Sequence, residues 1–232
     1  MNLLNKIKFH VKEMKEKRSK KFIIYRLLTI INRRIPIPNE VYLKHMSFYD
    51  EIRLEKYLNP SNNLDAIDIG ANYGLWTLRY TDNYKGVHSF EPNPNTFRLL
   101  KKNTRKLSNV ELYCCALGEK NSVGDFLMHK SVGRNGFVIK RNDYIRTIKV
   151  PIKSLDSFGF KDVGLIKIDT EGFELPILMG SINTLEREKP QLFIEIHKKD
   201  QEIPIFNLLK ELNYEYLVFK IRLDDQIIII TK

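Results

Sequence analysis

The stretch Asp68–Gly74 reads D-I-G-A-N-Y-G and continues directly from the apolar segment Leu64–Ile69. An apolar strand that ends in an acidic residue and turns through glycines into a helix is typical of a nucleotide-binding corner. Gly70 permits the tight turn, and Gly74 lets the following helix pack closely against the strand. The stretch therefore predicts a ligand site at the carboxyl end of this strand.

Asn72 stands where the dinucleotide-binding pattern G-x-G-x-x-G has a further glycine. Asn tolerates a positive φ, so the turn is retained, but the close backbone approach to a pyrophosphate is lost. With Asp68 in front, this corner favours a ligand with cationic and hydroxyl groups and no phosphate. S-adenosylmethionine, which carries an amino group, a sulfonium and a ribose, meets that description.

A second acidic residue ends the next predicted strand, Gly86–Glu91, and is followed by Pro92. Glu91 lies 17 positions beyond Gly74, close to the roughly 20-residue offset at which a carboxylate accepts hydrogen bonds from ribose hydroxyls. A carboxylate at this point repels a 2′-phosphate, which disfavours NADP. We therefore expect Glu91 at the ribose of the cofactor.

Further motifs follow in a fixed order: A-L-G at 116–118, S-L-D at 154–156 and K-I-D-T-E-G-F-E at 167–174. From about residue 52 to residue 219, their order and spacing resemble the FkbM family of S-adenosylmethionine-dependent methyltransferases. K-I-D-x-E-G-x-E is the most specific element of this resemblance. Similar proteins often have a polar residue such as Asn just before A-L-G, where this chain has Cys114 and Cys115.

The resemblance implies an α/β fold of the class I methyltransferase (Rossmann-like) type. Its mostly parallel seven-stranded sheet would have helices on both faces, in line with the alternation of predicted strands and helices. Strands are expected at 64–69, 86–91, 109–115, 163–169 and 191–196, helices at 40–58, 74–83, 94–107, 175–188 and 203–212, and a closing antiparallel pair at 216–219 and 226–231. Residues 119–152 break the alternation and predict a β-hairpin insertion after the third strand, which would cover the site as a lid or substrate wall.

Ligands of such sheets bind beyond the carboxyl ends of the strands. The expected cofactor-binding residues are accordingly Asp68, Gly70, Asn72, Gly74, Glu91, Pro92, Cys115, Ala116 and Asp169.

Methyl transfer to a hydroxyl requires alignment of the acceptor with the methyl group and removal of the acceptor's proton. Lys167, Asp169 and Glu171 alternate along a predicted strand and its exit, so they share one face of an extended segment. Two carboxylates and an ammonium are costly to bury there unless they pair with one another or serve in binding or catalysis. A structural alternative is a Lys167–Glu171 ion pair that braces the loop while Asp169 caps the next helix.

His197 is the histidine, among five, that falls at the carboxyl end of a predicted core strand. An imidazole with a pKa near neutrality could act as the general base, so we predict Asp169, Lys167, Glu171 and His197 as catalytic residues. The alternative to a catalytic role is a surface histidine whose ring nitrogens are already hydrogen-bonded. Asp169 with Glu195 or His197 could instead hold Mg²⁺ or Mn²⁺ that acidifies the acceptor hydroxyl, although a metal-free site is favoured.

Positive charge is concentrated at the beginning of the 232-residue chain. Residues 1–34 contain eleven Lys and Arg and two Glu, a net charge of +9, which leaves +2 of the total of +11 for the remaining residues. A nucleic-acid-modifying domain usually carries a basic face over its catalytic module. The near-neutral module therefore disfavours nucleic acid as a partner.

We divide the chain into a basic helical arm, 1–38, and a methyltransferase domain, 39–232. The arm could pack on the domain or on a second copy in a homodimer, contact an anionic membrane surface through residues 1–35, or bind another acidic partner. Its apolar segment Phe22–Ile35 is too short to span a bilayer and contains three arginines. With no secretory signal and two adjacent cysteines, we expect a cytoplasmic protein, with peripheral membrane attachment as an open alternative.

The favoured function is S-adenosylmethionine-dependent O-methylation of a hydroxyl on a sugar, glycan or related small metabolite, an acceptor class implied by the resemblance. RNA methylation is the first alternative, weakened by the neutral module and by the lack of an N/D-P-P-Y/F signature. The second alternative is a catalytically idle fold that serves as a membrane or assembly adaptor. Retention of the charged residues argues against it: Asp68, Glu91, Asp169 and Glu171 are all present.

Overall fold

The computed structural model describes residues 54–129, 144–220 and 227–232. The predicted arm, its boundary at residue 38 and most of the helix predicted at 40–58 lie outside the described residues; within that helix, Leu54–Tyr57 form a short 3-10 helix, η1. The chain divides into two units, Met1–Tyr57 and Leu58–Lys232. The description below concerns the second unit.

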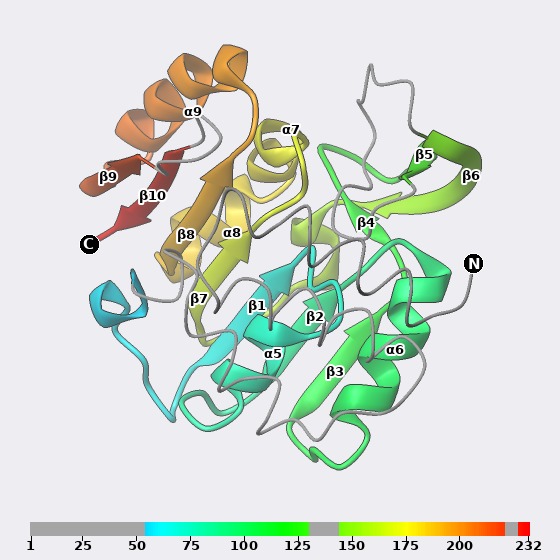
Figure 1. Ribbon diagram of the computed structural model, residues 1–232. Helices are drawn as coiled ribbons and strands as arrows, with labels where there is room; N and C mark the ends of the chain where they lie inside the picture. The colour runs from blue at the N-terminus through cyan, green and yellow to red at the C-terminus, as the bar shows by residue number, and fades with distance from the viewer. Residues whose placement is uncertain (1–53, 130–143, 221–226) are drawn as a thin grey trace, which may run out of the picture. The chain divides into compact units, whose positions relative to one another are not determined.

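A seven-stranded sheet runs through this unit in the order β3-β2-β1-β7-β8-β10-β9 (Figure 1). Its strands are β1 (Asp65–Ile69), β2 (Val87–Phe90), β3 (Val110–Tyr113), β7 (Val163–Ile168), β8 (Gln191–Ile196), β9 (Tyr216–Lys220) and β10 (Ile227–Thr231). The first five in this order pair in parallel, and β10 is antiparallel to both β8 and β9. The predicted mostly parallel seven-stranded sheet with a closing antiparallel pair is confirmed.

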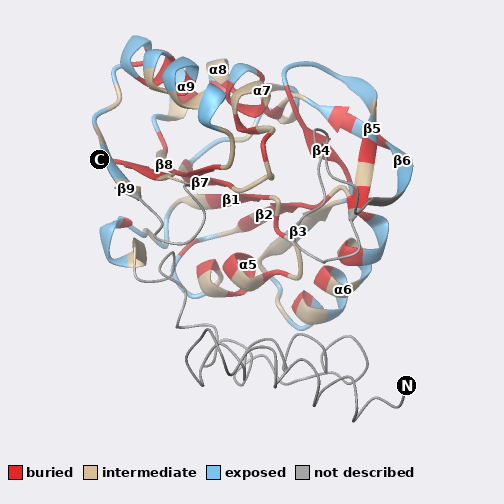
Figure 2. Cartoon of the chain, turned by 45° about the horizontal axis from the view of Figure 1, so that its top comes forward, coloured by how far each residue is buried: buried red, intermediate tan, exposed pale blue. Residues whose placement is uncertain are grey.

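Helices cover both faces of the sheet, as predicted. Helices α5 (Leu75–Tyr80) and α6 (Pro94–Thr104) lie on one face, and α7 (Glu174–Met179), α8 (Ile182–Glu188) and α9 (Lys199–Glu211) lie on the other (Figure 2). Because both faces are covered, the central strands are near-continuous apolar runs, and β8 is buried from Leu192 to Ile196. Among the described helices, none has the length and apolarity needed to cross a bilayer.

The prediction of a single helix at 175–188 is wrong, because the chain forms two helices there, which are separated at Gly180 and Ser181. A Cβ on Gly180 would lie 2.0 Å from the carbonyl oxygen of Gly118, so the backbone passes too close to another segment for a continuing helix with ordinary side chains. The second helix is capped at its N-terminus by a residue from another segment. Asp156 accepts hydrogen bonds from the backbone N–H groups of Asn183 (3.0 Å) and Thr184 (2.8 Å). This contact explains the aspartate of the S-L-D motif.

The insertion forms a sheet of its own. Strands β5 (Ser122–His129) and β6 (Tyr144–Lys153) are antiparallel, which confirms the predicted hairpin, and β4 (Ala116–Leu117) pairs in parallel with β6. The predicted third strand therefore ends at Tyr113 rather than at residue 115, because the chain leaves the main sheet there. This small sheet has a separate apolar core of Ala116, Phe126, Met128, Val150 and Ile152.

We expect Asp156→Ala to lower the free energy of unfolding by about 1–2 kcal/mol, the usual cost of a lost helix cap. Urea denaturation followed by circular dichroism measures it. Asp125→Ala is the matched control, because the ion pair of Asp125 with Lys149 has both side chains more than 60% exposed and should contribute less than about 0.5 kcal/mol. Equal losses in the two variants would remove the capping role from Asp156.

Candidate active site

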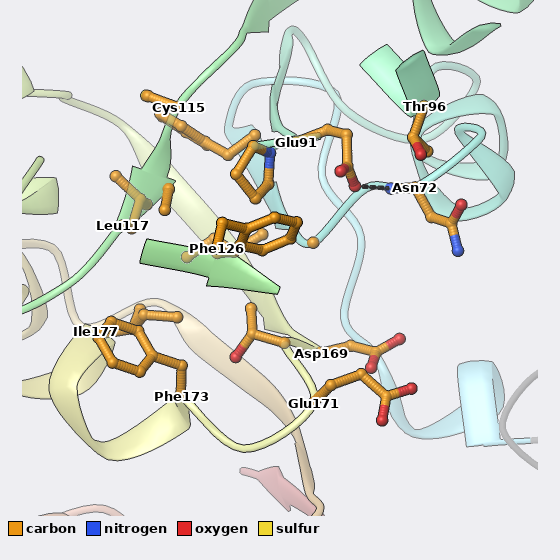
Figure 3. Close-up of a pocket in the computed structure, with 16 residues that line it drawn as sticks. Asn72, Glu91, Thr96, Cys115, Leu117, Phe126, Asp169, Glu171, Phe173 and Ile177 are labelled. Carbon is orange, nitrogen blue, oxygen red and sulfur yellow. Dashed lines mark hydrogen bonds between the residues drawn. The ribbon is translucent and has the colours of Figure 1, made fainter. Parts of the chain in front are cut away.

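A pocket opens at the carboxyl ends of β1, β2 and β7, where the strand order reverses (Figure 3). Such a switch point is the usual ligand site of an open α/β sheet. The pocket contains about 650 Å³ of empty space, which includes open solvent. It is lined by Ile69, Gly70, Asn72, Phe90, Glu91, Pro92, Thr96, Cys115, Ala116, Leu117, Phe126, Asp169, Thr170, Glu171, Phe173 and Ile177.

Most of the predicted cofactor-binding residues meet in this pocket, although they come from distant parts of the chain. Those that line it are Gly70, Asn72, Glu91, Pro92, Cys115, Ala116 and Asp169. Asp68 and Gly74 do not line it. Gly74 starts α5 with φ of 91°, and a Cβ there would lie 2.6 Å from Cδ1 of Leu100, so its helix-packing role holds but the close neighbour is α6.

Glu91 joins the glycine corner to the end of β2. Its Oε2 accepts the N–H of Asn72 at 3.0 Å, and its Oε1 accepts the N–H of Asn93 at 2.8 Å. Asn72 has φ of 53°, the left-handed conformation expected of it. Burial raises the pKa of Glu91 to about 7, against the effect of both N–H donors, which lower it.

Beneath the pocket, a buried ammonium connects β1 and β7. The Nζ of Lys167 donates to Oδ2 of Asp169 at 3.1 Å and lies 4.0 Å from Oδ1 of Asp68. Asp68 is fully buried and its Oδ2 accepts the hydroxyl of Thr77 at 2.7 Å; burial raises its pKa, although Lys167 and Thr77 oppose this. Asp68 and Lys167 therefore support the pocket from below, whereas the sequence predicted that Asp68 would contact the cofactor.

His197 follows β8 and lies among three carboxylates. Its Nδ1 is 3.2 Å from Oε1 of Glu174, and its Nε2 is 3.6 Å from Oδ1 of Asp169 and 3.5 Å from Oε1 of Glu195. Burial alone would lower its pKa, but the hydrogen bond with Glu174 and the nearby carboxylates raise it to about 10. A raised pKa disfavours the neutral imidazole that a general base requires, which argues against the predicted role of His197 as general base.

Asp169 occupies the meeting point of these contacts and reaches the pocket. Burial favours its neutral form, but the positive charges of Lys167 and His197 prevail and lower its pKa. Glu171 also lines the pocket, from the turn after β7, where its φ is 57°. Of the four predicted catalytic residues, Asp169 and Glu171 face the pocket, and Lys167 and His197 contact Asp169 from behind.

Sequence reasoning missed several apolar wall residues: Ile69, Phe90, Leu117, Phe126, Phe173 and Ile177, together with Thr96 and Thr170. Phe126 comes from β5 of the insertion (Figure 3), so the insertion supplies part of the pocket wall. Leu117 belongs to the A-L-G motif, which was a signal that could have indicated it. No local pattern singles out Phe126, because its position in the pocket wall depends on how the small sheet packs.

Comparison with known proteins places these residues in a family. Residues 68–216, more than half of the chain, match the family model described as the methyltransferase FkbM domain. The chain belongs to the FkbM methyltransferase family. This confirms the family that the motifs indicated.

Two relatives and one solved structure are similar to this FkbM-family chain. It is 28% identical over 141 residues to Methyltransferase 1 of Beauveria bassiana, covering 49% of this chain and 57% of that protein. It is 27% identical over 184 residues to the hexuronic acid methyltransferase AglP of Haloferax volcanii, covering 78% of this chain and 75% of that protein. The crystal structure of the methyltransferase FkbM from Methylobacillus flagellatus KT superposes with a TM-score of 0.56 at 15% identity over 87% of this chain and 57% of that one.

The chain thus spans a little over half the length of the Beauveria and Methylobacillus proteins. At this identity the structural likeness concerns the fold, and it confirms the class I methyltransferase architecture.

The last glutamate of the FkbM-family motif K-I-D-x-E-G-x-E closes the loop after β7. Glu174 is fully buried, and its Oε1 accepts the N–H of Gly172 at 2.8 Å and the hydroxyl of Thr170 at 3.3 Å. Gly172 has φ of 102°, and a Cβ there would lie 2.5 Å from the side chain of Lys198. The motif therefore fixes a tight turn that places Asp169 and Glu171 at the pocket.

Because folding raises the pKa of Glu91 from 4.5 to about 7, its contribution to stability is full below pH 4.5 and is lost as the pH rises through 7. We expect the free energy of unfolding of the wild type, minus that of Glu91→Gln, to fall by about 2 kcal/mol between pH 5 and pH 8. Urea denaturation of both proteins at the two pH values measures this difference, in which the titrations that the substitution does not affect cancel. A difference independent of pH would mean that Glu91 has an ordinary pKa.

Proposed function

We propose that this FkbM-family chain is an S-adenosylmethionine-dependent O-methyltransferase that acts on a hydroxyl group of a sugar, a glycan or a related metabolite. The observation that carries the proposal is the presence in one pocket of Glu91, at the end of β2, and Asp169, at the end of β7. We assign the first to the ribose of the cofactor and the second to the acceptor.

The residues of the pocket fit the cofactor. The oxygens of Glu91 each accept one backbone N–H, and a carboxylate oxygen has a further lone pair for a ribose hydroxyl. Apolar walls that include Leu117, Phe126 and Ile177 suit a purine ring. Asp169 supplies negative charge for a ligand with cationic groups, and S-adenosylmethionine supplies, when bound, a methyl group on a sulfonium leaving group.

The acceptor requires orientation and loss of a proton. Asp169 is held by Lys167 and His197 on separate oxygens, so its position is fixed before any acceptor binds. Asp169 and Glu171 are the candidates for orienting the hydroxyl, and proton removal uses a carboxylate or a metal ion. The similarity to a hexuronic acid methyltransferase supports a sugar or sugar acid as the acceptor.

Methyl transfer is tested with S-adenosylmethionine labelled in the methyl group and a panel of hexuronates, neutral sugars and glycosides, with structured RNA as the contrasting acceptor. We expect label in a sugar product that survives mild alkali, as a methyl ether does. Label lost in alkali would indicate a methyl ester on a carboxylate, and label in RNA alone would contradict the proposal.

We expect Glu91→Ala to weaken the binding of S-adenosylhomocysteine by about 10- to 100-fold, because hydrogen bonds to a charged acceptor contribute roughly 1.5–3 kcal/mol. Calorimetric titration of the full chain measures the affinity. Glu186→Ala, at an exposed position on α8, is the control and should bind as the wild type does. Unchanged affinity in Glu91→Ala would remove this residue from the cofactor site.

We expect Asp169→Asn to lower turnover at least 100-fold, the low end of the contribution of acid–base groups, while S-adenosylhomocysteine still binds. Thermal melting of the variant checks that the fold is kept without the charge that Lys167 contacts. Loss of ligand affinity in place of turnover would move Asp169 to the methionine end of the cofactor.

A further inference from the structure

Three potential metal ligands converge where β7 and β8 end. Asp169, Glu195 and His197 each place one ligand atom so that the three atoms lie within 4.8 Å of one another. His197 Nε2 is 3.6 Å from Asp169 Oδ1 and 3.5 Å from Glu195 Oε1. Ligand atoms at roughly 2.1 Å from a shared ion lie about 3.0–3.4 Å apart in octahedral or tetrahedral geometry. A contraction of a few tenths of an ångström would suffice for these two contacts.

The surroundings fix His197 and Asp169 from outside the cluster. The Nδ1 of His197 contacts Oε1 of Glu174 at 3.2 Å, and that fully buried carboxylate is itself held by the N–H of Gly172. Metal-ligating histidines almost always use their second ring nitrogen in this way, on a carboxylate or carbonyl, and this contact orients the ring. Here it directs Nε2 toward the two carboxylates.

The two oxygens of Asp169 have separate partners. Lys167 binds Oδ2 at 3.1 Å, and Oδ1 faces His197. Lys167 thus holds the carboxylate while the oxygen on the side of Glu195 and His197 remains directed into the cluster. Because Asp169 also lines the pocket, an ion at this point would border the space that an acceptor enters.

We propose that Asp169, Glu195 and His197 bind one divalent cation of the Mn²⁺ class at the edge of the pocket. Carboxylate oxygens suit Mn²⁺ and Mg²⁺, and the imidazole favours Mn²⁺ over Mg²⁺. The proposal that a cation binds here stands on this geometry alone. A role of the cation in the reaction rests on the proposed function, in which the cation would acidify the acceptor hydroxyl.

The test uses the full chain, treated with EDTA and then freed of it, and MnCl₂ as the probe. Electron paramagnetic resonance of free Mn²⁺ and calorimetry should give one site per chain in the wild type. Glu195→Gln and His197→Gln should each weaken Mn²⁺ binding at least 10-fold, whereas Glu186→Gln, on exposed α8 surface, should not change it. Absence of saturable binding, or wild-type affinity in Glu195→Gln, overturns the proposal.

A second readout needs no variant. Electron spin echo modulation of Mn²⁺ bound to the wild type should show the nitrogen coupling of a ligating imidazole, and its absence overturns the assignment of His197. Titration of S-adenosylhomocysteine with EDTA and with Mn²⁺ separates the two proposals. Cofactor binding without Mn²⁺ binding contradicts the metal site alone, and Mn²⁺ binding without cofactor binding contradicts the proposed function alone.

Discussion

The pairing of one buried ammonium with two carboxylates is the constraint on which the pocket depends. Lys167 is opposite Asp68 in the register of β7 and β1, and its Nζ reaches both Asp68 and Asp169. Removal of one member of a buried charged set leaves the others uncompensated, typically at a cost of about 3–5 kcal/mol. The two strands at the point where the strand order reverses are therefore joined by charge as well as by backbone hydrogen bonds, and Asp169 is held at the pocket edge.

The motifs of the family interlock around this point. A Cβ on Gly70 would lie 1.9 Å from the carbonyl oxygen of Asp169, so the glycine corner can approach the end of β7 only without a side chain. The same corner continues to Asn72, whose N–H is bound by Glu91. Motifs that are far apart in the sequence are thus successive contacts across the carboxyl ends of β7, β1 and β2, and this explains why D-I-G-A-N-Y-G, the strand-end Glu91 and K-I-D-x-E-G-x-E occur together.

Much of this arrangement could be predicted because it follows from local rules. Alternating strands and helices indicate a parallel sheet, and the carboxyl ends of parallel strands meet at one edge, so Glu91 and Asp169 could be brought together from the sequence. The remainder depends on contacts between distant segments. The end of α7 reflects the approach of Gly180 to Gly118, and the raised pKa of His197 reflects carboxylates from three segments; neither leaves a periodic signal in the sequence.

The most direct test is a crystal structure of the full chain with S-adenosylhomocysteine. We predict that the ribose hydroxyls lie within hydrogen-bonding distance of Glu91, that the purine contacts Phe126, and that the contact between Lys167 and Asp169 stays near 3.1 Å, because the charged network is formed before the ligand binds. A ligand bound away from Glu91, or a Lys167 that leaves Asp169 to contact the ligand, would contradict this account.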